Sequence, residues 1–255
     1  MRYALVNGVR QEAQPKHRGG CPNCGREMVA RCGKKRIWHW SHLGKLECDH
    51  WWEPETEWHR LWKAQFPPEW QEVPHIAADG ERHIADVKTG AGWVIELQNS
   101  PISPEERQSR EAFYQPMLWV INGLRYKRDL SAFRNAVIGA QIAKDNPLYL
   151  DPANDMAQIF QRWAPRQRPV FLDFGDEEFH VEGFPLGASV LWQLLLHPGP
   201  GDLIIAAVTR ESFVQFGLKG SPLQHVFVMR GPQPQKLLYP RLRQRRPYRP
   251  PSRRY

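Results

Sequence analysis

The chain has 255 residues, of which 41% are hydrophobic, and it carries a formal net charge of +8. This length supports a substantial core in one large domain or two modest ones, and the composition is that of a folded protein. Because no apolar run approaches the roughly 20 residues that span a bilayer, and the start lacks the apolar segment of a signal peptide, we expect a cytoplasmic protein without membrane contact.

All four cysteines lie between positions 21 and 48, a clustering that indicates metal binding rather than a disulfide framework. Cys21 and Cys24 form a C-x₂-C pair, and a hairpin predicted around Gly33 leads to the H-x₂-H pair of His39 and His42. Four nitrogen and sulfur ligands suit tetrahedral Zn²⁺ in a closed, structural site. Residues 1–50 are therefore predicted to form a zinc-ribbon-like module.

The zinc ligands have alternatives in the same stretch. Cys32, Cys48 and His50 lie close to the two pairs in sequence, and the H-x₂-H spacing is tighter than in common zinc fingers. In a competing interpretation, the thiols stay reduced and pack as small hydrophobic groups. We rank the C-x₂-C and H-x₂-H pairs first because together they provide a complete ligand set.

The next predicted element is a helix over residues 55–63. One side of it carries an apolar stripe with i, i+3 and i+4 spacing, formed by Trp58, Leu61 and Trp62. Glu55, His59 and Lys63 recur at i, i+4 and i+8 and run beside that stripe. We therefore expect Glu55 to point inward.

Three strands are predicted next, over residues 70–73, 84–88 and 93–98, and the last two are joined by a short turn that suits a hairpin. Because side chains alternate along a strand, Asp86 lies on one face of the first hairpin strand, and Glu96 with Gln98 on one face of the second. Adjacent carboxylates repel each other unless a cation neutralises them. Oxygen ligands of this kind suit Mg²⁺ or Mn²⁺.

A second helix is predicted to begin at a capping box, with Ser103 as N-cap, Pro at N1 and Glu at N3. Arg110 and Tyr114 lie on one face of this helix. The apolar run over residues 117–121 then predicts a buried strand. The predicted order is helix, three strands, helix, strand.

The segment from 148 to 230 is predicted to be a small α+β unit. We expect a hairpin over residues 170–181, a helix over 191–196 and a strand over 203–208. Acids in the turn of that hairpin, such as Asp173, could bind a cation, although turn acids seldom do. The sequence assigns no purpose to this unit.

Residues 231–255 contain eight Lys or Arg, six Pro and no acid, and the remaining 27 basic residues equal the 27 acidic ones. The prolines oppose helix and central strand, so we expect a disordered basic tail. A polybasic arm attracts phosphates in a salt-dependent way, which favours nucleic acid as a partner. The alternatives are a solubilising terminus or contact with an acidic protein.

The motifs between residues 21 and 122 resemble, in their order, the PD-(D/E)XK restriction-endonuclease-like fold with its αβββαβ core. More narrowly, they resemble the competence protein CoiA-like family. The resemblance rests on the Cys21/Cys24 and His39/His42 pairs, the helix with Glu55, His59 and Lys63, Asp86, Glu96 with Gln98, and the segment from Ser100 to Arg110 and Tyr114. It implies an α+β protein with a zinc module, a nuclease-like domain over residues 51–147, and the C-terminal unit and tail described above.

The same resemblance implies a DNA nuclease that depends on Mg²⁺ or Mn²⁺, in a family associated with DNA uptake and recombination. Its expected partners are single- or double-stranded DNA and recombination proteins. Asp86 and Glu96 would ligate the metal, with support from the Leu97 carbonyl, and the metal would activate a water for attack on a phosphodiester. Glu55 would complete the shell.

The remaining site residues have supporting roles in this interpretation. Gln98 stands where the superfamily usually has Lys, and it would orient the attacking water without contributing charge. Arg110 and Tyr114 would contact the substrate, Arg110 by holding a neighbouring phosphate. His59 and His83 are candidates for acid/base roles.

Two other function classes remain open. A non-cleaving DNA-binding accessory of recombination would use the nuclease fold and basic tail as a clamp, and tight burial of Asp86 without room for a metal would favour it. The third class is a protein–protein adaptor that uses the C-terminal half.

Overall fold

The computed structural model describes residues 1–44, 48–144, 147–153, 155–165, 167–181, 184–186, 189–195 and 203–226. It is a mixed α+β structure with a five-stranded sheet, a nine-stranded sheet and a small two-stranded ribbon. The predicted basic tail lies outside the described residues. None of the helices within these ranges is long and apolar enough to cross a membrane.

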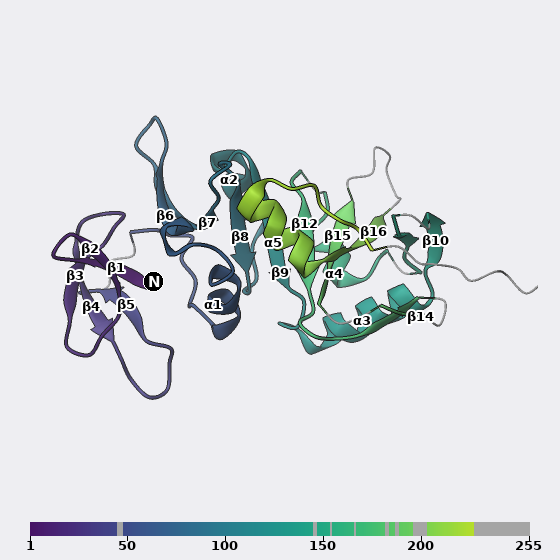
Figure 1. Ribbon diagram of the computed structural model, residues 1–255, viewed down its shortest axis with the longest axis horizontal. Helices are drawn as coiled ribbons and strands as arrows, with labels where there is room; N and C mark the ends of the chain where they lie inside the picture. Colours follow the sequence, from purple (N-terminus) through teal and green to yellow (C-terminus); the bar gives the residue numbers. More distant parts are fainter. Residues whose placement is uncertain are drawn as a thin grey trace, which may run out of the picture.

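The first 42 residues form the antiparallel five-stranded sheet, with strand order β2-β1-β3-β4-β5. Its strands are β1 (Tyr3–Val6), β2 (Val9–Glu12), β3 (Arg18–Gly20), β4 (Glu27–Arg31) and β5 (His39–His42). This N-terminal sheet lies at one end of the elongated molecule (Figure 1). The predicted hairpin is confirmed, although its return strand begins only at His39.

The nine-stranded sheet has the order β10-β11-β16-β15-β12-β9-β8-β7-β6. Its strands are β6 (Gln71–Ile76), β7 (Arg82–Lys88), β8 (Val94–Gln98), β9 (Met117–Asn122), β10 (Gln141–Lys144), β11 (Tyr149–Asp151), β12 (Val170–Asp173), β15 (Val190–Leu195) and β16 (Ile204–Thr209). Strand β9 pairs in parallel with both β8 and β12, and the other pairs are antiparallel. The sheet therefore takes strands from both of the segments expected as a nuclease-like domain and a C-terminal unit.

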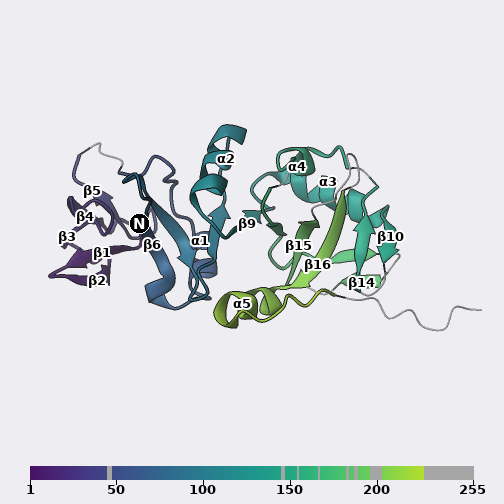
Figure 2. The ribbon, with the colours of Figure 1, turned by 90° about the horizontal axis from the view of Figure 1, so that it is seen from above.

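Helices cover both faces of this sheet, as Figure 2 shows for α5 on one side and α3 with α4 on the other. The helices are α1 (Glu57–Lys63), α2 (Pro104–Phe113), α3 (Lys127–Ile138), α4 (Gln158–Gln161) and α5 (Arg210–Lys219), with a short 3-10 turn η1 (Pro68–Trp70) before β6. Because side chains alternate along the buried central strands, these strands contribute apolar side chains to the core on both faces of the sheet. In β9, Trp119 packs with Phe133 of α3, whereas Leu118 and Val120 pack with Phe213 of α5.

The predicted order of helix, three strands, helix and strand is observed as α1, β6, β7, β8, α2 and β9. Ser103 caps α2 by accepting a hydrogen bond from the Glu106 amide. Helix α1 begins two residues later than expected, with Thr56 as its N-cap. Of the predicted apolar stripe on α1, Trp62 is buried but Leu61 is 61% exposed.

Two predictions for the C-terminal half are wrong. Residues 191–196 were expected to be helical, yet β15 lies between β12 and β16, and its apolar side chains are buried on both faces. A continuous apolar run lacks the periodicity that separates a buried strand from a helix. The expected hairpin over 170–181 is also absent, because β12 pairs with β9 and β15 while β13 (Phe179–Val181) pairs with β14 (Phe184–Leu186).

The N-terminal sheet is fastened to the nine-stranded sheet through Glu72 in β6. The Glu72 carboxylate accepts hydrogen bonds from the backbone amides of Arg2, at 2.8 and 2.9 Å, and Tyr3, at 3.1 Å. The Arg10 guanidinium donates to the Gln71 carbonyl at 2.6 Å. These contacts place the N-terminal sheet against the strands that carry the acids.

Asp173, at the end of β12, fixes α1 on the sheet. Its carboxylate accepts hydrogen bonds from the indole N–H groups of Trp58, at 2.8 Å, and Trp62, at 2.7 Å. The Arg210 guanidinium of α5 donates to the other oxygen at 2.6 Å. Asp173 is 2% exposed, so these donors replace the water that its charge would otherwise require.

We expect Asp173→Ala to lower the free energy of unfolding by about 3 kcal/mol, because two indole donors and a guanidinium lose their acceptor. Urea denaturation followed by tryptophan fluorescence measures this effect. The control is Asp176→Ala, which removes an exposed carboxylate nearby and should change stability by less than about 0.5 kcal/mol. Equal losses for the two variants would contradict the role given to Asp173.

Candidate functional site

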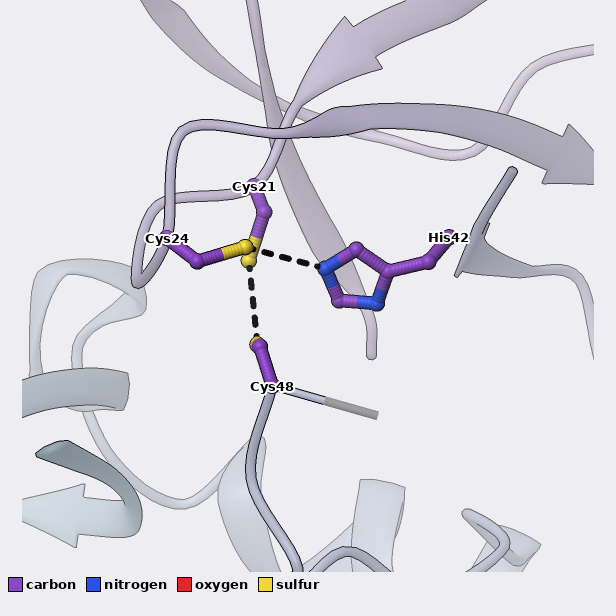
Figure 3. Close-up of side chains that lie close together, drawn as sticks. All are labelled: Cys21, Cys24, His42 and Cys48. Carbon is purple, nitrogen blue, oxygen red and sulfur yellow. Dashed lines mark hydrogen bonds between the residues drawn. The ribbon is translucent and has the colours of Figure 1, made fainter. Parts of the chain in front are cut away.

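Three cysteines and one histidine meet at the edge of the N-terminal sheet (Figure 3). The ligand atoms of Cys21, Cys24, His42 and Cys48 all lie within 4.8 Å of one another. The Cys21 and Cys48 sulfurs are 3.7 Å apart, and Cys24 Sγ lies 3.3 Å from His42 Nε2. This cluster, which we call the cysteine cluster, could bind a metal such as zinc.

A tight turn presents the C-x₂-C pair. The Cys21 carbonyl accepts a hydrogen bond from the Gly25 amide at 2.9 Å, and the Cys21 amide donates to the Arg26 carbonyl at 2.8 Å. Gly25 has a φ of +73°, a conformation that costs glycine little and other residues more. The turn therefore aims both thiols to the same side.

His39 does not belong to the cysteine cluster, contrary to the predicted ligand set, and Cys48 supplies the fourth group. Residues three apart on a strand point to opposite faces, so His39 and His42 of β5 cannot both face one ion. His39 Nδ1 instead lies 2.8 Å from the Ile37 carbonyl. Of the alternatives, Cys48 is in the cluster, whereas Cys32 and His50 are not.

The cysteine cluster favours a thiolate. The hydrogen bond between the Cys21 and Cys48 sulfurs lowers the pKa of Cys21 to about 5 and raises that of Cys48. Backbone amides of Cys24 and Asn23 support the lowered pKa of Cys21. Since metals bind the thiolate form, Cys21 is prepared to act as a ligand near neutral pH.

We expect the purified chain to contain about one zinc ion, and Cys48→Ser to lose most of it because a closed tetrahedral site needs all four ligands. Elemental analysis of the dialysed protein measures the content. His39→Ala and Cys32→Ser are the matched controls and should retain the metal. Zinc loss from His39→Ala with retention in Cys48→Ser would restore the ligand set predicted from the sequence.

A second group of side chains lines a pocket of about 70 Å³ between α1, β6, β7, β8 and α2. Glu55, Asp86 and Glu96, the three acids expected to act together, all face it. Lys63 and Glu72 line it as well. We call this the acid pocket.

Asp86 and Glu96 each accept a hydrogen bond from a backbone amide of the neighbouring strand. Asp86 Oδ2 accepts a hydrogen bond from the Leu97 amide at 3.0 Å, and the Asp86 amide donates to Glu96 Oε1 at 3.3 Å. The pairing of β7 with β8 continues at Val87 and Ile95. The predicted juxtaposition of the two carboxylates on neighbouring strands is therefore observed.

Lys63 lies among three carboxylates. Its Nζ is 3.0 Å from Glu55 Oε1, 3.0 Å from Glu72 Oε1 and 3.6 Å from Asp86 Oδ1. Although burial lowers the pKa of Lys63, the charges of Glu72, Asp86 and Glu55 raise it overall. Lys63 is therefore a permanent cation that partly neutralises the acid pocket.

The surroundings of Glu96 oppose its ionisation. Burial and the charge of Asp86 raise the pKa of Glu96 to about 8, although Arg110 opposes that shift from 3.1 Å. Burial also raises the pKa of Asp86. Two neighbouring carboxyls that both resist ionisation form a pair that a cation would stabilise.

His59 and Arg110 position the groups around the acids. His59 Nδ1 accepts from the Thr56 amide at 3.2 Å, so in the neutral ring the proton lies on Nε2, which is 3.1 Å from the Leu97 carbonyl oxygen. Arg110 is 5% exposed and also donates to the Trp51 carbonyl at 2.7 Å. Arg110 therefore faces the acid pocket, but its guanidinium already pairs with Glu96.

Gln98 and Tyr114 do not line the acid pocket. The Gln98 amide donates to the Ser100 carbonyl at 3.1 Å and hydroxyl at 3.2 Å, because β8 ends at this residue and its side chain folds back on the following turn. Tyr114 is fully buried and packs against Trp51 and Phe113. The roles predicted for Gln98 in catalysis and Tyr114 in substrate binding therefore lack support from this geometry.

Three further acids that the sequence did not indicate, Glu53, Glu72 and Asp49, also line the acid pocket. Asp49 accepts from the Ile84 amide at 2.8 Å and lies 2.8 Å from His83 Nδ1, while His83 Nε2 lies 2.9 Å from Glu81. Asp49, His50 and His83 form a second group close enough to hold a metal. The acids at 49 and 72 carry no local pattern, so only the fold reveals them.

Comparisons with protein-family models, curated proteins and solved structures gave no significant match.

The raised pKa of Glu96 predicts a pH dependence of stability in metal-free buffer. Between about pH 4.5 and 8 the unfolded chain loses this proton while the folded chain keeps it, so stability falls as pH rises through that window. Glu96→Gln removes the penalty. We expect its free energy of unfolding to exceed that of the wild type by more than about 1 kcal/mol at pH 8.5, with the gain shrinking toward pH 4.5.

Chemical denaturation across this pH range measures the difference. The control is Glu69→Gln, which changes an exposed carboxylate and should give no difference that grows with pH. A gain for Glu96→Gln that stays constant with pH would contradict the raised pKa.

Proposed function

We propose that this protein is a divalent-metal-dependent deoxyribonuclease of the competence CoiA-like type. The observation that carries the proposal is the convergence of Glu55, Asp86 and Glu96 on one pocket, from the residue before the N-cap of α1 and from two paired strands. The order α1, β6, β7, β8, α2, β9 supports it, since this is the element order of the αβββαβ core. The proposal links the protein to the handling of DNA during uptake or recombination.

The donors fit a hard cation such as Mg²⁺ or Mn²⁺. Asp86 and Glu96 would hold the metal, and Glu55 would add a third carboxylate. Both Glu55 oxygens are buried and lack a hydrogen bond of good geometry, although Lys63 lies 3.0 Å away. All of these donors are oxygens, which Mg²⁺ prefers to nitrogen or sulfur. When bound, the metal would lower the pKa of a water and stabilise charge on the leaving oxygen.

The acid pocket has room for such an ion with some of its water. A single buried water needs about 10–15 Å³ of accessible space, whereas the pocket offers about 70 Å³. Asp86 keeps a quarter of its side chain exposed. Asp86 is therefore not tightly buried without room for a metal, the arrangement that would have favoured a non-cleaving protein.

Lys63 would supply the positive charge that the superfamily's usual lysine provides and that Gln98 lacks. Its ammonium is 3.6 Å from Asp86, so it could donate to a phosphate oxygen beside the metal ligands. His59 would act as a positioning residue, because its Nε2 lies 3.1 Å from the carbonyl oxygen of Leu97, the neighbour of Glu96 in β8. Arg110 would hold Glu96 in place through their 3.1 Å contact.

One observation favours a second function, that of a DNA-binding accessory without cleavage. Lys63 already supplies a positive charge beside Glu55, Glu72 and Asp86. A pocket whose acids are partly neutralised by the protein itself could serve as a clamp for DNA without a metal.

Cleavage of labelled single- and double-stranded DNA with Mg²⁺ or Mn²⁺ tests the two functions. We expect Asp86→Asn and Glu96→Gln to lower the cleavage rate by about 100-fold or more, because each removes a metal ligand. Asp79→Asn is the control, since it changes an exposed acid in the turn between β6 and β7. If wild type and both variants cleave equally, the acid pocket is not the active site, and if wild type binds DNA without cleaving it the accessory function stands.

A further inference from the structure

A large cleft of about 1160 Å³ opens beside the N-terminal sheet. It is lined by β4, β5 and the connection between them, and also by Cys48, Asp49 and Trp52 and by Ile84 of β7. The cleft thus runs between the N-terminal sheet and the strands that carry the acid pocket.

The lining of this cleft is strongly basic. Four cations come from the end of β4 and the β4–β5 connection, namely Arg31, Lys34, Lys35 and Arg36. All four are exposed, and Lys34, Lys35 and Arg36 form no ion pair within the described residues. Asp49 is the one acid that lines the cleft in the described part of the chain, and its carboxylate is engaged by His83 and the Ile84 amide. Such a lining attracts a polyanion.

The cleft is continuous with the acid pocket. Met1, Asp49, Trp52 and Ile84 line both hollows. Trp52 stands at this junction with 48% of its surface exposed, an unusual exposure for a tryptophan. A polyanion that follows the basic lining therefore passes an accessible indole before it reaches Asp86 and Glu96.

We propose that this cleft binds single-stranded nucleic acid and leads its backbone into the acid pocket, an inference that rests on the function proposed above. Cations along a groove that neutralise phosphates, with an exposed aromatic ring for stacking, are what single-strand binding requires. Stacking on Trp52 needs an unpaired base, which a duplex does not offer. The small acid pocket likewise admits a single backbone rather than a paired helix.

The test measures binding of a labelled single-stranded oligonucleotide by fluorescence anisotropy, without Mg²⁺ so that no cleavage occurs. We expect the triple variant Lys34→Gln, Lys35→Gln, Arg36→Gln to bind at least about 10-fold more weakly at low salt. Its log–log salt slope should be shallower by about two, since each neutralised phosphate contributes about 0.7 on single strands.

The matched control carries the same charge change at exposed positions away from the cleft, Lys127→Gln, Arg128→Gln and Lys219→Gln. It should keep the wild-type affinity and slope. If the cleft variant and this control lose binding equally, only the net charge matters and the cleft proposal is overturned.

Variants of Trp52 test whether the cleft prefers single strands to duplexes. Trp52→Ala should weaken single-strand binding by about 10-fold, in line with the loss of one stacked base, whereas Trp52→Phe should restore most of it. Binding of a hairpin duplex should be the same for wild type and Trp52→Ala. Equal losses on both substrates would overturn the choice of single-stranded nucleic acid.

The acid variants distinguish this inference from the proposed nuclease. Asp86→Asn and Glu96→Gln remove negative charge from the acid pocket, so in metal-free buffer they should bind the oligonucleotide no more weakly than the wild type, even where they fail to cleave. Cleft-dependent binding by a wild type that cleaves no DNA would overturn the nuclease and keep the cleft. Cleavage that depends on the acids but not on the cleft residues would overturn the cleft and keep the nuclease.

Discussion

The ammonium group of Lys63 is the contact on which the arrangement of this protein depends. Its three carboxylate partners come from the start of α1, from β6 and from β7. One of them, Glu72, also accepts the backbone amides of Arg2 and Tyr3. A single buried cation therefore joins the N-terminal sheet, the first helix and an acid-bearing strand. Removing it would leave three largely buried carboxylates without their cation, which is far more costly than losing an exposed ion pair.

The segment from Cys48 to Trp52 gives the molecule its second connection. Within five residues it contributes a thiol to the cysteine cluster, a carboxylate that holds the Ile84 amide, a carbonyl that accepts from Arg110, and the indole at the cleft. The two candidate sites are thus joined by a stretch of chain too short to adjust at one end without moving the other.

Local patterns predicted the acid-bearing hairpin, because alternation and a short turn fix which side chains meet. They also predicted the start of α2, where Ser103 caps the helix. Long-range packing decided the rest. The ligand spacing does not reveal that the fold brings Cys48, rather than His39, to the cysteine cluster. The role of Glu72 depends on the docking of the separate N-terminal sheet. Residues 191–195 of the apolar run lie in a strand because strands pair on both of its edges.

A metal in the cysteine cluster would hold Cys48, and with it the adjoining Asp49 and the strand that Asp49 supports. By thermodynamic reciprocity, two ligands that stabilise one conformation of a shared segment raise each other's affinity by the same factor. A ligand bound in the acid pocket would then make the cysteine cluster hold its metal more tightly. The N-terminal sheet, which supplies three of the four ligands of that cluster, would in this way report on chemistry that takes place outside it.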